Sequence, residues 1–494
     1  MNKPEHEKHN GQRPAGRGGV RGTAPRRDGQ RRAAPIPGGG RKPAGDSRLA
    51  QSPRQAALKA LQDVVRGDAY AAQALDRQLT AARLSPEDRR LAASIFYFAV
   101  ENRLYIETML QRFMEAKAEP VVNDILHIAA AQLLFMDRVP DHAAVDEAVK
   151  QVRFVRREGL TGLVNGVLRN LIRARDEGAL TLPDRETSPV DYLSVRYSYA
   201  PELASRLMDA YGLEVAERIA ACRSDGVQTV RFNRLRTDAD AFATWLDGQG
   251  LKWRRGDVEG AFRIENGGNL ADNDGYRHGL YAIQGQSAML AALAVEARPG
   301  MQVLDACAAP GGKTALMAEC MNGAGRVFAW DVHEHRVQLI RAAAARLGLD
   351  NVRATVYDAR RPMESMRLSM DAVLVDAPCS GIGVVPEKPD IKYRVRAAEL
   401  DALPALQGQI LSACAQSVKV GGRLVYATCT LLPAENEAVV RAFLAAHPEF
   451  EPETSANWLP EALRPELHQG MLTLLPDREG FEGFFIARMR RKGV

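Results

Sequence analysis

The sequence contains few of the features that mark secreted, membrane-bound or zinc-binding proteins. Its 494 residues include six cysteines, and no two of them form a C-x-x-C pair, so neither a disulfide framework nor a zinc site is expected. No apolar run approaches the ~18 residues of a membrane-spanning helix, and the N-terminus lacks the apolar stretch of a signal peptide. These absences favour a cytoplasmic protein without a membrane partner.

The composition is that of an ordinary globular chain, with one uneven feature. Hydrophobic residues make up 46% and charged residues 26% of the sequence, and a length of about 150 residues per domain leaves room for about three domains. Residues 1–50 hold 12 Lys and Arg against 4 Asp and Glu, although the net charge of the whole chain is only +5. Because this segment is also rich in Gly and Pro, we expect residues 1–52 to form a disordered basic tail that either attracts phosphates or only increases solubility.

Residues 53–180 have helical periodicity throughout. Ser85-Pro86-Glu87-Asp88 combines a capping residue, a proline at the first helical position and acidic residues in the first turn, which predicts the start of a long helix. The apolar positions that follow recur at helical spacing and predict its core-facing side: Leu91, Ile95, Phe98, Leu104, Ile106 and Leu110. Such a pattern predicts an all-α bundle.

Two stretches of this bundle resemble the helical domain of the antitermination factor NusB. They are A-A-V-D-E-A-V at Ala143–Val149 and L-V-N-G-V-L-R-N at Leu163–Asn170. The resemblance implies that residues 53–180 form a NusB-like domain that binds RNA. The candidate phosphate contacts are Arg153, Arg156, Arg157, Arg169 and Arg173. A solvated helix face would explain these arginines equally well, so both interpretations stay open.

Residues 181–268 predict a helical connector followed by a small α+β domain of RRM-like proportions. The strand and helix patterns of that domain alternate in the order Thr229–Leu235, Asp240–Leu246, Leu251–Arg255 and Phe262–Glu265. Phe232 and Trp253 could stack on bases, although packing in the core is the more frequent use of such aromatic residues.

The remaining residues, 269–494, alternate strand and helix patterns, which indicates a Rossmann-type α/β domain. Its central stretch is M-Q-V-L-D-A-C-A-A-P-G-G-K-T (Met301–Thr314): a strand ending in Asp305, a loop of small residues and the start of a helix. The loop nearly matches the phosphate-binding P-loop, but Cys307 replaces the first glycine and Pro310 removes one N–H donor. A triphosphate is therefore the weaker interpretation, and the alternative is S-adenosylmethionine, a ligand with an adenosine but no phosphates. The loop residues predicted to bind it are Cys307, Ala308, Ala309, Pro310, Gly311, Gly312 and Lys313.

Polar residues follow each of the later strands of this predicted sheet. Arg326–Asp331 ends in the acid that a Rossmann-type sheet uses for ribose hydroxyls, and the next strand is followed by Asp358, which suits an adenine amino group. Two further strands end in D-A-P-C-S-G and T-C-T, which contain Asp376, Cys379 and Cys429. Because the carboxyl ends of parallel strands line one crevice, we expect a shared site there. Its predicted cofactor-binding acids are Asp331, Asp358 and Asp376, and its predicted catalytic residues are Cys429, Cys379 and Asp376.

Together, D-A-C-A-A-P-G-G-K-T, D-A-P-C-S-G and A-T-C-T resemble the bacterial RNA cytosine-C5 methyltransferases, and with the NusB-like domain they resemble the 16S rRNA enzymes of the RsmB type. The resemblance extends from about residue 53 to the C-terminus. It implies methylation of a cytosine in a single-stranded loop of 16S rRNA, with S-adenosylmethionine as cofactor and no DNA partner. It further implies that Cys429 adds to C6, that Cys379 assists proton removal from C5 and product release, and that Asp376 holds or protonates N3. Lys313 and Lys392 are expected helpers, and we expect a monomer.

The sequence departs from the family pattern at two places, and other classes of protein remain alternatives. Gly285 stands where an Asp is expected, and Pro386-Glu387-Lys388 stands where a basic run is expected. A DNA cytosine methyltransferase would use Cys379 as its nucleophile, whereas a P-loop NTPase would bind MgATP. A non-catalytic rRNA-binding assembly factor is the third alternative. His333-Glu334-His335 is expected to be a solvated helix start, so no metal site is predicted.

Overall fold

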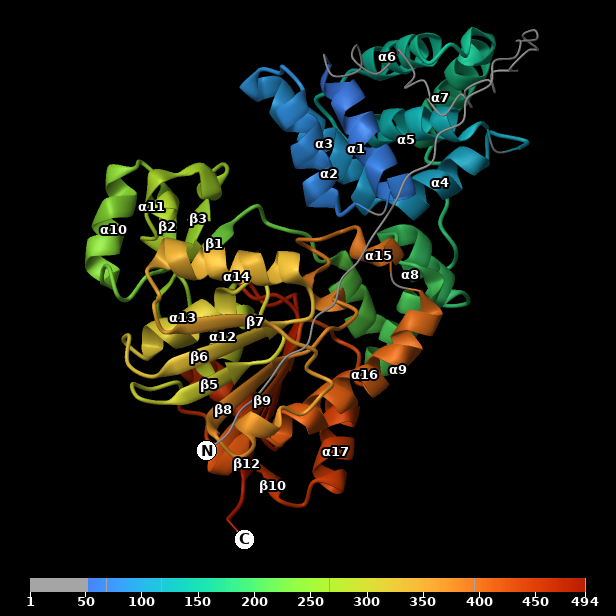
Figure 1. Ribbon diagram of the computed structural model, residues 1–494. Helices are drawn as coiled ribbons and strands as arrows, with labels where there is room; N and C mark the ends of the chain where they lie inside the picture. The colour runs from blue at the N-terminus through green and yellow to red at the C-terminus, as the bar shows by residue number, and fades with distance from the viewer. Residues whose placement is uncertain (1–51, 68, 117, 266, 395, 494) are drawn as a thin grey trace, which may run out of the picture. The chain divides into compact units, whose positions relative to one another are not determined.

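The computed structural model describes residues 52–493 apart from 68, 117, 266 and 395, so the predicted basic tail lies outside the described residues except for Ser52. Figure 1 shows three kinds of structure along the chain: a helical bundle, a small sheet with short helices, and a large mixed sheet flanked by helices. In this part of the chain, no helix is both long and apolar enough to cross a membrane.

The first part is a bundle of seven helices packed around one apolar core. These are α1 (Pro53–Gly67), α2 (Ala71–Ala81), α3 (Pro86–Glu101), α4 (Arg103–Gln111), α5 (Pro120–Phe135), α6 (Asp141–Phe154) and α7 (Thr161–Asp176). The predicted start of α3 is confirmed, because the Ser85 side chain accepts a hydrogen bond from the amide of Asp88 and Pro86 occupies the first turn.

The predicted long helix after Ser85 is wrong in one respect, because it is divided into α3 and α4 at Asn102. The backbone of Asn102 leaves the helical region at φ −112° and ψ 26°. Its side-chain amide donates a hydrogen bond to the carbonyl of Phe98, at 3.1 Å. An asparagine side chain that competes with the backbone in this way favours a helix end, and the apolar periodicity alone did not reveal it.

The second part contains α8 (Pro189–Tyr197), α9 (Pro201–Ala221) and a four-stranded antiparallel sheet in the order β2-β3-β1-β4. The elements of this small domain are β1 (Gln228–Phe232), α10 (Ala239–Gly248), β2 (Lys252–Arg255), β3 (Ala261–Glu265), α11 (Asp274–Arg277) and β4 (Tyr281–Ile283). The sheet therefore extends past residue 268, the predicted end of this domain. The strand β4 has three residues, which is too short to show a recognisable alternation.

The two aromatic residues considered for base stacking pack inside this small domain. Phe232 is buried against Phe242 and Phe262. Trp253 packs against Phe262, and its indole N–H donates to Asp247 at 2.8 Å. Core packing thus accounts for both side chains.

The third part is built on an eight-stranded sheet in the order β10-β12-β9-β8-β5-β6-β7, with β11 paired to β12. Its strands are β5 (Gln302–Asp305), β6 (Arg326–Asp331), β7 (Val352–Val356), β8 (Met370–Asp376), β9 (Val418–Thr428), β10 (Phe450–Pro452), β11 (Met471–Leu474) and β12 (Phe484–Arg491). The five strands from β9 to β7 in this order are parallel, and β12 pairs antiparallel with β9, β10 and β11.

Helices cover both faces of this sheet. The main covering helices are α12 (Gln286–Leu293), α13 (Gly312–Cys320), α14 (Glu334–Leu347), α16 (Ala397–Ala415) and α17 (Glu437–Ala446), and the short α15 (Ile391–Arg394) precedes α16. Successive residues of β5 lie on opposite faces of the sheet. Val303 packs in a core with α12 and α13, whereas Leu304 packs in a core with α16 and α17. A strand that is buried on both faces reads as a continuous apolar run, as the sequence shows. The parallel strands consequently end at one common edge, where the predicted site residues lie.

Candidate active site

The two predicted catalytic cysteines meet at this edge of the sheet. The strands β8 and β9 are parallel neighbours, with Asp376 opposite Ala427. Cys379 follows the end of β8 and Cys429 follows the end of β9, and their Sγ atoms lie 3.4 Å apart. Both residues are half-buried, as are Cys222, Cys307 and Cys320, so the contact between the two sulfur atoms is what distinguishes this pair. A cysteine that only fills a core has no such partner.

The surroundings of the two thiols favour ionisation of one and protonation of the other. The pKa of Cys429 is lowered, first by the hydrogen bond from Cys379 and then by the charges of Lys313 and Lys388, against the opposing effects of burial and of Asp376. The pKa of Cys379 is raised well above its usual value by its hydrogen bond with Cys429 and by burial. Of the two thiols, Cys429 is therefore the one whose ionisation the surroundings favour.

An ion pair stands beside the cysteine pair. Lys313 Nζ donates a hydrogen bond to Asp376 Oδ2 at 2.7 Å, and it lies 5.2 Å from the centroid of the Phe484 ring. Burial acts to lower the pKa of Lys313, but the charge and hydrogen bond of Asp376 outweigh burial, so the net pKa is raised. Lys313 is therefore a cation next to Cys429, as its predicted role requires. Asp376 is fixed at the end of β8, where a base held near Cys429 could reach it.

The loop between β5 and α13 is shaped for close approach by a ligand. Gly311 has φ 105°, and a Cβ at this position would lie 3.2 Å from Cα of Ile340. A side chain is therefore strained here both by the backbone conformation and by the lack of space. The amides at the start of α13 face the same edge as the strand ends, as in nucleotide-binding α/β units.

Two carboxylates, from the ends of β5 and β6, flank this loop. Asp305 is fully buried, its Oδ2 accepts a hydrogen bond from Thr314 at 2.6 Å, and its Oδ1 has no partner. Burial raises the pKa of Asp305 to about 7. Asp331 is also buried, with Oδ1 accepting from the amide of His333 and Oδ2 3.4 Å from Arg336. An open loop, an acid at the ribose position and an unpaired acceptor together fit the binding of S-adenosylmethionine.

The side chains of Asp358 and Lys392 have partners other than those expected from the sequence. Both oxygens of Asp358 accept hydrogen bonds from Arg360, which lowers the pKa of this carboxyl, so an adenine amino group would have to share Asp358 with Arg360. Lys392 is occupied by partners other than those that its expected helper role requires. Its ammonium group is buried and donates to the carbonyls of Glu101 and Tyr197, and burial lowers its pKa to about 7. Lys392 thus links α15 to the helices that precede the sheet.

The glycine that departs from the family pattern has a spatial explanation. A Cβ on Gly285 would overlap the carboxylate of Glu482. That carboxylate accepts a hydrogen bond from the amide of Ser287 in the first turn of α12, and the Ser287 hydroxyl donates to the backbone carbonyl of Glu482. An acidic group is therefore present at this helix start, but it comes from the C-terminal part of the chain. Of the second departing stretch, Lys388 is exposed and contributes to the lowered pKa of Cys429.

Two residues for which the sequence motifs predicted no role, Glu435 and Asn436, support the cysteine loops. Glu435 and Asn436 are both buried and hydrogen-bond the residues next to the cysteines. Two polar residues directly before an apolar helix were a usable signal, because buried polar groups need specific partners.

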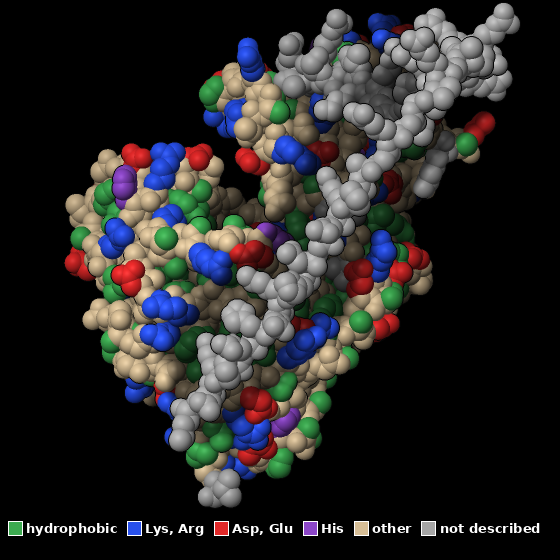
Figure 2. All heavy atoms as spheres, in the orientation of Figure 1, with side chains coloured by type: hydrophobic (Ala, Val, Ile, Leu, Met, Phe, Trp, Pro, Cys, Tyr) green, Lys and Arg blue, Asp and Glu red, His purple; other side chains and the backbone are tan. Residues whose placement is uncertain are grey.

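The arginines predicted to contact phosphates are all exposed on or beside α6 and α7. Arg157 pairs with Glu119 at 2.6 Å and Arg169 donates to Asn165. Over the described residues visible in Figure 2, basic and acidic side chains are interspersed. RNA binding by these arginines stays a prediction.

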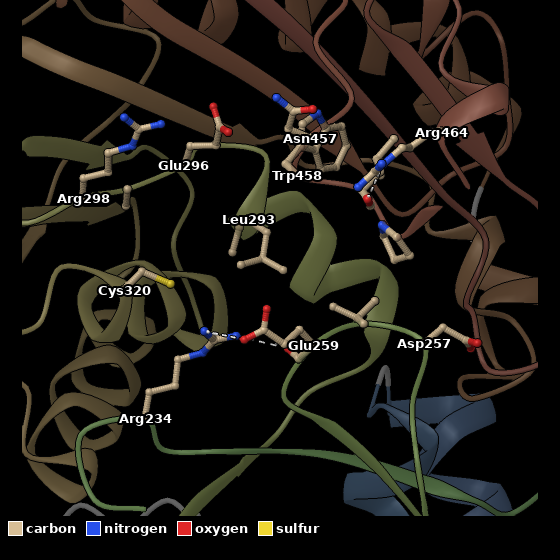
Figure 3. A pocket seen from close by; sticks show the side chains of 15 residues that line it. Arg234, Asp257, Glu259, Leu293, Glu296, Arg298, Cys320, Asn457, Trp458 and Arg464 are labelled. Atoms are coloured by element: carbon tan, nitrogen blue, oxygen red, sulfur yellow. Dashed lines mark hydrogen bonds and ion pairs between the residues drawn. The ribbon is translucent and has the colours of Figure 1, made fainter. Parts of the chain in front are cut away.

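A hollow beside the sheet lies away from the cysteine site. A cavity of about 490 Å³ is lined by the ends of α12 and α13, including Leu293 and Cys320, and by Arg234, Trp458 and Arg464. Figure 3 shows the ion pair of Arg234 with Glu259 on one wall and Trp458 with Arg464 on the opposite wall. Because α13 begins in the cofactor loop and ends here, this hollow lies at the far end of the helix. Among the described residues, no cluster of three or more His, Cys, Asp or Glu side chains is placed to hold a metal ion.

Comparison with known proteins agrees with the geometry at the strand ends. A profile for the family described as 16S rRNA methyltransferase RsmB/F matches residues 292–490, and the NusB family profile matches residues 51–173. The probable ribosomal RNA small subunit methyltransferase B of Bacillus subtilis is 38% identical over 450 residues, which cover 90% of this chain and 99% of that protein. The chain belongs to the ribosomal RNA small subunit methyltransferase B family. The predicted family resemblance and the NusB-like domain are thereby confirmed.

Other members of the methyltransferase B family and one solved structure extend this result. The ribosomal RNA small subunit methyltransferase B of Pseudomonas putida is 31% identical over 450 residues, covering 89% of this chain and 98% of that protein. The crystal structure described as PH0851 has a TM-score of 0.75 at 23% identity and covers 89% of this chain and 98% of its own, which shows a shared fold. As a family member, the chain is an rRNA methyltransferase that uses S-adenosylmethionine, and the P-loop NTPase alternative is not supported.

Proposed function

We propose that this methyltransferase modifies C5 of a cytosine in 16S rRNA through a transient bond between Cys429 and C6 of the base. The observation that carries the proposal is the 3.4 Å separation of the Cys379 and Cys429 Sγ atoms, with Lys313 and Asp376 beside them. Carbon 5 of cytosine is too weak a nucleophile to accept a methyl group unaided. Addition of a thiolate to C6 makes C5 electron-rich, which divides one difficult step into two easier ones.

The residues of the site divide the chemistry between them. Cys429, as thiolate, donates its electron pair to C6, and the electrons of the C5–C6 bond move toward N3. Asp376 holds the base at N3. Because Lys313 donates a hydrogen bond to Asp376, this pair has a proton that N3 can take up as the bond to C6 forms. S-adenosylmethionine, when bound by the β5–α13 loop and Asp331, supplies an electrophilic methyl group for C5.

The second cysteine completes the cycle. Once Cys429 is bonded to C6, its negative charge is gone, and with it one cause of the raised pKa of Cys379. Cys379, after releasing its own proton to solvent, can then accept the C5 proton, and N3 returns its proton to the Asp376–Lys313 pair. The electrons of the C5–H bond re-form the C5–C6 double bond, and Cys429 leaves as thiolate.

The substrate and setting follow from this chemistry. The target base must be unstacked to reach two thiols at a strand end, so we propose a single-stranded loop of the rRNA as the substrate. The exposed arginines of α6 and α7 would hold the phosphates around it. We propose that the enzyme acts in the cytoplasm as a monomer, because one chain supplies every group of the site.

Bisulfite sequencing of small-subunit rRNA tests the proposed reaction in cells. A strain that lacks the gene should lose protection of one cytosine, and wild-type protein should restore that protection. The Cys429→Ala variant should not restore it, provided that immunoblotting shows equal amounts of the two proteins. Unchanged protection in the deletion strain would contradict the proposal.

A further inference from the structure

A buried carboxylate joins the two loops that carry the cysteines. Glu435, between β9 and α17, is fully buried. Its Oε2 accepts a hydrogen bond from the amide of Ser380 at 2.9 Å, and its Oε1 accepts one from Thr430 Oγ1 at 3.3 Å. Ser380 directly follows Cys379, and Thr430 directly follows Cys429. One side chain therefore holds the residue next to each thiol.

Further hydrogen bonds make this connection rigid. The Ser380 and Thr430 hydroxyls lie 2.6 Å apart and hydrogen-bond each other. Gln407 Nε2 donates both to Glu435 Oε2 and to the carbonyl of Pro378, each at 2.9 Å, so Cys379 is held from both sides. Each contact crosses from one part of the chain to another, since Gln407 lies on α16.

Asn436 forms hydrogen bonds with the residues on either side of Cys429. Its Oδ1 accepts a hydrogen bond from Thr428 Oγ1 at 2.6 Å, and its Nδ2 donates to the carbonyl of Thr430 at 3.0 Å. Cys429 is thus held on both sides by Asn436. The polar pair Glu435-Asn436 consequently fixes both cysteines to one element of structure.

A carboxyl group is unusual at so buried a position as that of Glu435. Its hydrogen-bond donors are an amide N–H, a side-chain amide and a hydroxyl, all neutral, and no ion pair is formed with it among the described residues. A buried carboxyl group without a cation beside it is unfavourable for folding, and an apolar residue would pack there at a smaller cost in free energy. The presence of a carboxyl group beside two thiols therefore points to a role in the site.

We propose that Glu435 is a positioning residue that sets the distance between the Cys379 and Cys429 sulfur atoms through its hydrogen bonds to Ser380 and Thr430. The proposal rests on the proposed function, because it concerns the division of roles between these cysteines. A negative charge near Cys379 also opposes ionisation of that thiol, after the effects of Cys429 and burial. Glu435 thereby helps to ensure that Cys429, and not Cys379, is the nucleophile.

The Glu435→Gln variant tests this role without changing the volume of the side chain. One acceptor oxygen becomes an NH₂ group, which can be placed only toward the Thr430 hydroxyl, because the other oxygen faces two N–H donors. Thr430 must then accept instead of donate, so its hydrogen bond with Ser380 has to rearrange as the charge is lost. We expect kcat to fall by about 100-fold, as for a displacement of roughly 1 Å at the reacting atoms, while KM for RNA and for S-adenosylmethionine changes by less than about 2-fold. Glu437→Gln is the matched control, because Glu437 lies two residues along the chain and accepts from Thr473 instead.

A second readout does not depend on methylation. The full-length protein without RNA is treated with limiting iodoacetamide, and the alkylated peptides are quantified by mass spectrometry. In wild-type protein and E437Q, we expect Cys429 to be alkylated at least about 10-fold faster than Cys379, as a thiolate beside a thiol should be. In E435Q, this ratio should fall by about 5-fold or more. A Thr430→Val variant should show the same fall, and Thr430→Ser should keep the wild-type ratio, even if E435Q does not fold.

The proposal and the proposed function fail in different ways. An unchanged alkylation ratio in both E435Q and T430V would overturn the role of Glu435, even when the wild-type enzyme methylates rRNA. A wild-type enzyme that forms no covalent bond with RNA containing 5-fluorocytosine would overturn the proposed function. A lower ratio in E435Q and T430V, with KM unchanged, supports the role of Glu435.

Discussion

The two ends of strand β8 carry the same kind of ion pair but differ in everything around it. At the end of β8, Asp376 pairs with Lys313 at 2.7 Å; near its beginning, Asp371 pairs with Lys419 at 2.9 Å. Only the first pair lies beside two thiols and a cofactor loop. An aspartate–lysine pair is therefore not by itself a sign of catalysis, because its role depends on the groups that surround it.

The cysteines at the two ends of the sheet differ in the same way. The hollow of about 490 Å³ lies at the far ends of α12 and α13, and its one cysteine, Cys320, has a pKa raised by burial. At the opposite edge, Cys429 has a lowered pKa and a hydrogen-bonded partner. The arrangement of reactive groups, and not the volume of the hollow, therefore identifies the site.

Replacing Cys429 should have the largest effect at the catalytic end. The Cys429→Ser variant is expected to lower kcat by about 10⁴-fold or more, as loss of a covalent nucleophile does in other enzymes. Single-turnover methylation of an rRNA fragment would measure this loss. Cys379→Ala should still form the adduct with C6 but should release it slowly. Rapid product release by C379A would show that its thiol has no part in the second half of the reaction.

Comparing Lys313→Met with Lys419→Met tests the two ion pairs directly. Loss of Lys313 removes a cation that lowers the pKa of Cys429, so this pKa should rise and kcat should fall by about 10²- to 10³-fold. K419M should change kcat by less than about 2-fold, since a half-exposed ion pair contributes little.

The pH profile gives the sign of the effect of Lys313. Methylation should decrease as the pH falls through the pKa of Cys429, because the thiolate becomes protonated, and in wild-type protein this decrease should begin below the usual thiol pKa of about 8.5. In K313M, the same decrease should begin at a higher pH. Identical profiles for the two proteins would rule out electrostatic activation by Lys313.

A smaller effect, on stability, is expected at the start of α12. Gly285→Ala should destabilise the protein by about 1–3 kcal/mol, because its Cβ meets the Glu482 carboxylate. Thermal unfolding would measure this, and the double variant G285A/E482A should recover part of the loss. Gly166→Ala in α7 is the control, since nothing lies within 4 Å of the added Cβ. Equal melting temperatures for G285A and G166A would refute the steric explanation.

The smallest effects should come from the far hollow. Cys320→Ser and Arg464→Ala are expected to leave kcat and KM within about 2-fold of wild type, because neither side chain contacts the cysteine loops. Steady-state kinetics with the same rRNA fragment would measure both variants. A loss of 10-fold or more in either variant would mean that the two ends of the sheet are functionally connected.

The sequence predicted the site residues that lie in short motifs. It did not predict the contacts between residues that are far apart along the chain. The loop at Cys307–Lys313 and the strand ends at Cys379 and Cys429 are short motifs whose place at the carboxyl ends of parallel strands follows from topology. Glu435 also bonds Ser380, 55 residues earlier in the chain, and Glu482 reaches Ser287 at the start of α12 across 195 residues. The burial of Lys392 was not predicted because it depends on contact with helices nearly three hundred residues away, at Glu101.

The boundaries of elements were less predictable for related reasons. The strand β4 joins its sheet only through pairing with β1, and three residues carry no periodicity of their own. The division of the predicted long helix at Asn102 depends on one side-chain hydrogen bond to Phe98. In each case the deciding interaction is one that a pattern of apolar residues does not encode.

Mass spectrometry of the trapped complex tests the central claim most directly. The enzyme is incubated with S-adenosylmethionine and an rRNA fragment whose target base is 5-fluorocytosine, from which no C5 proton can be removed, and the cross-linked peptide is sequenced. The account predicts a nucleotide attached to the peptide that contains Cys429, with the adduct lost in C429A and retained in C379A. An adduct that maps to Cys379, or one that persists in C429A, would contradict it.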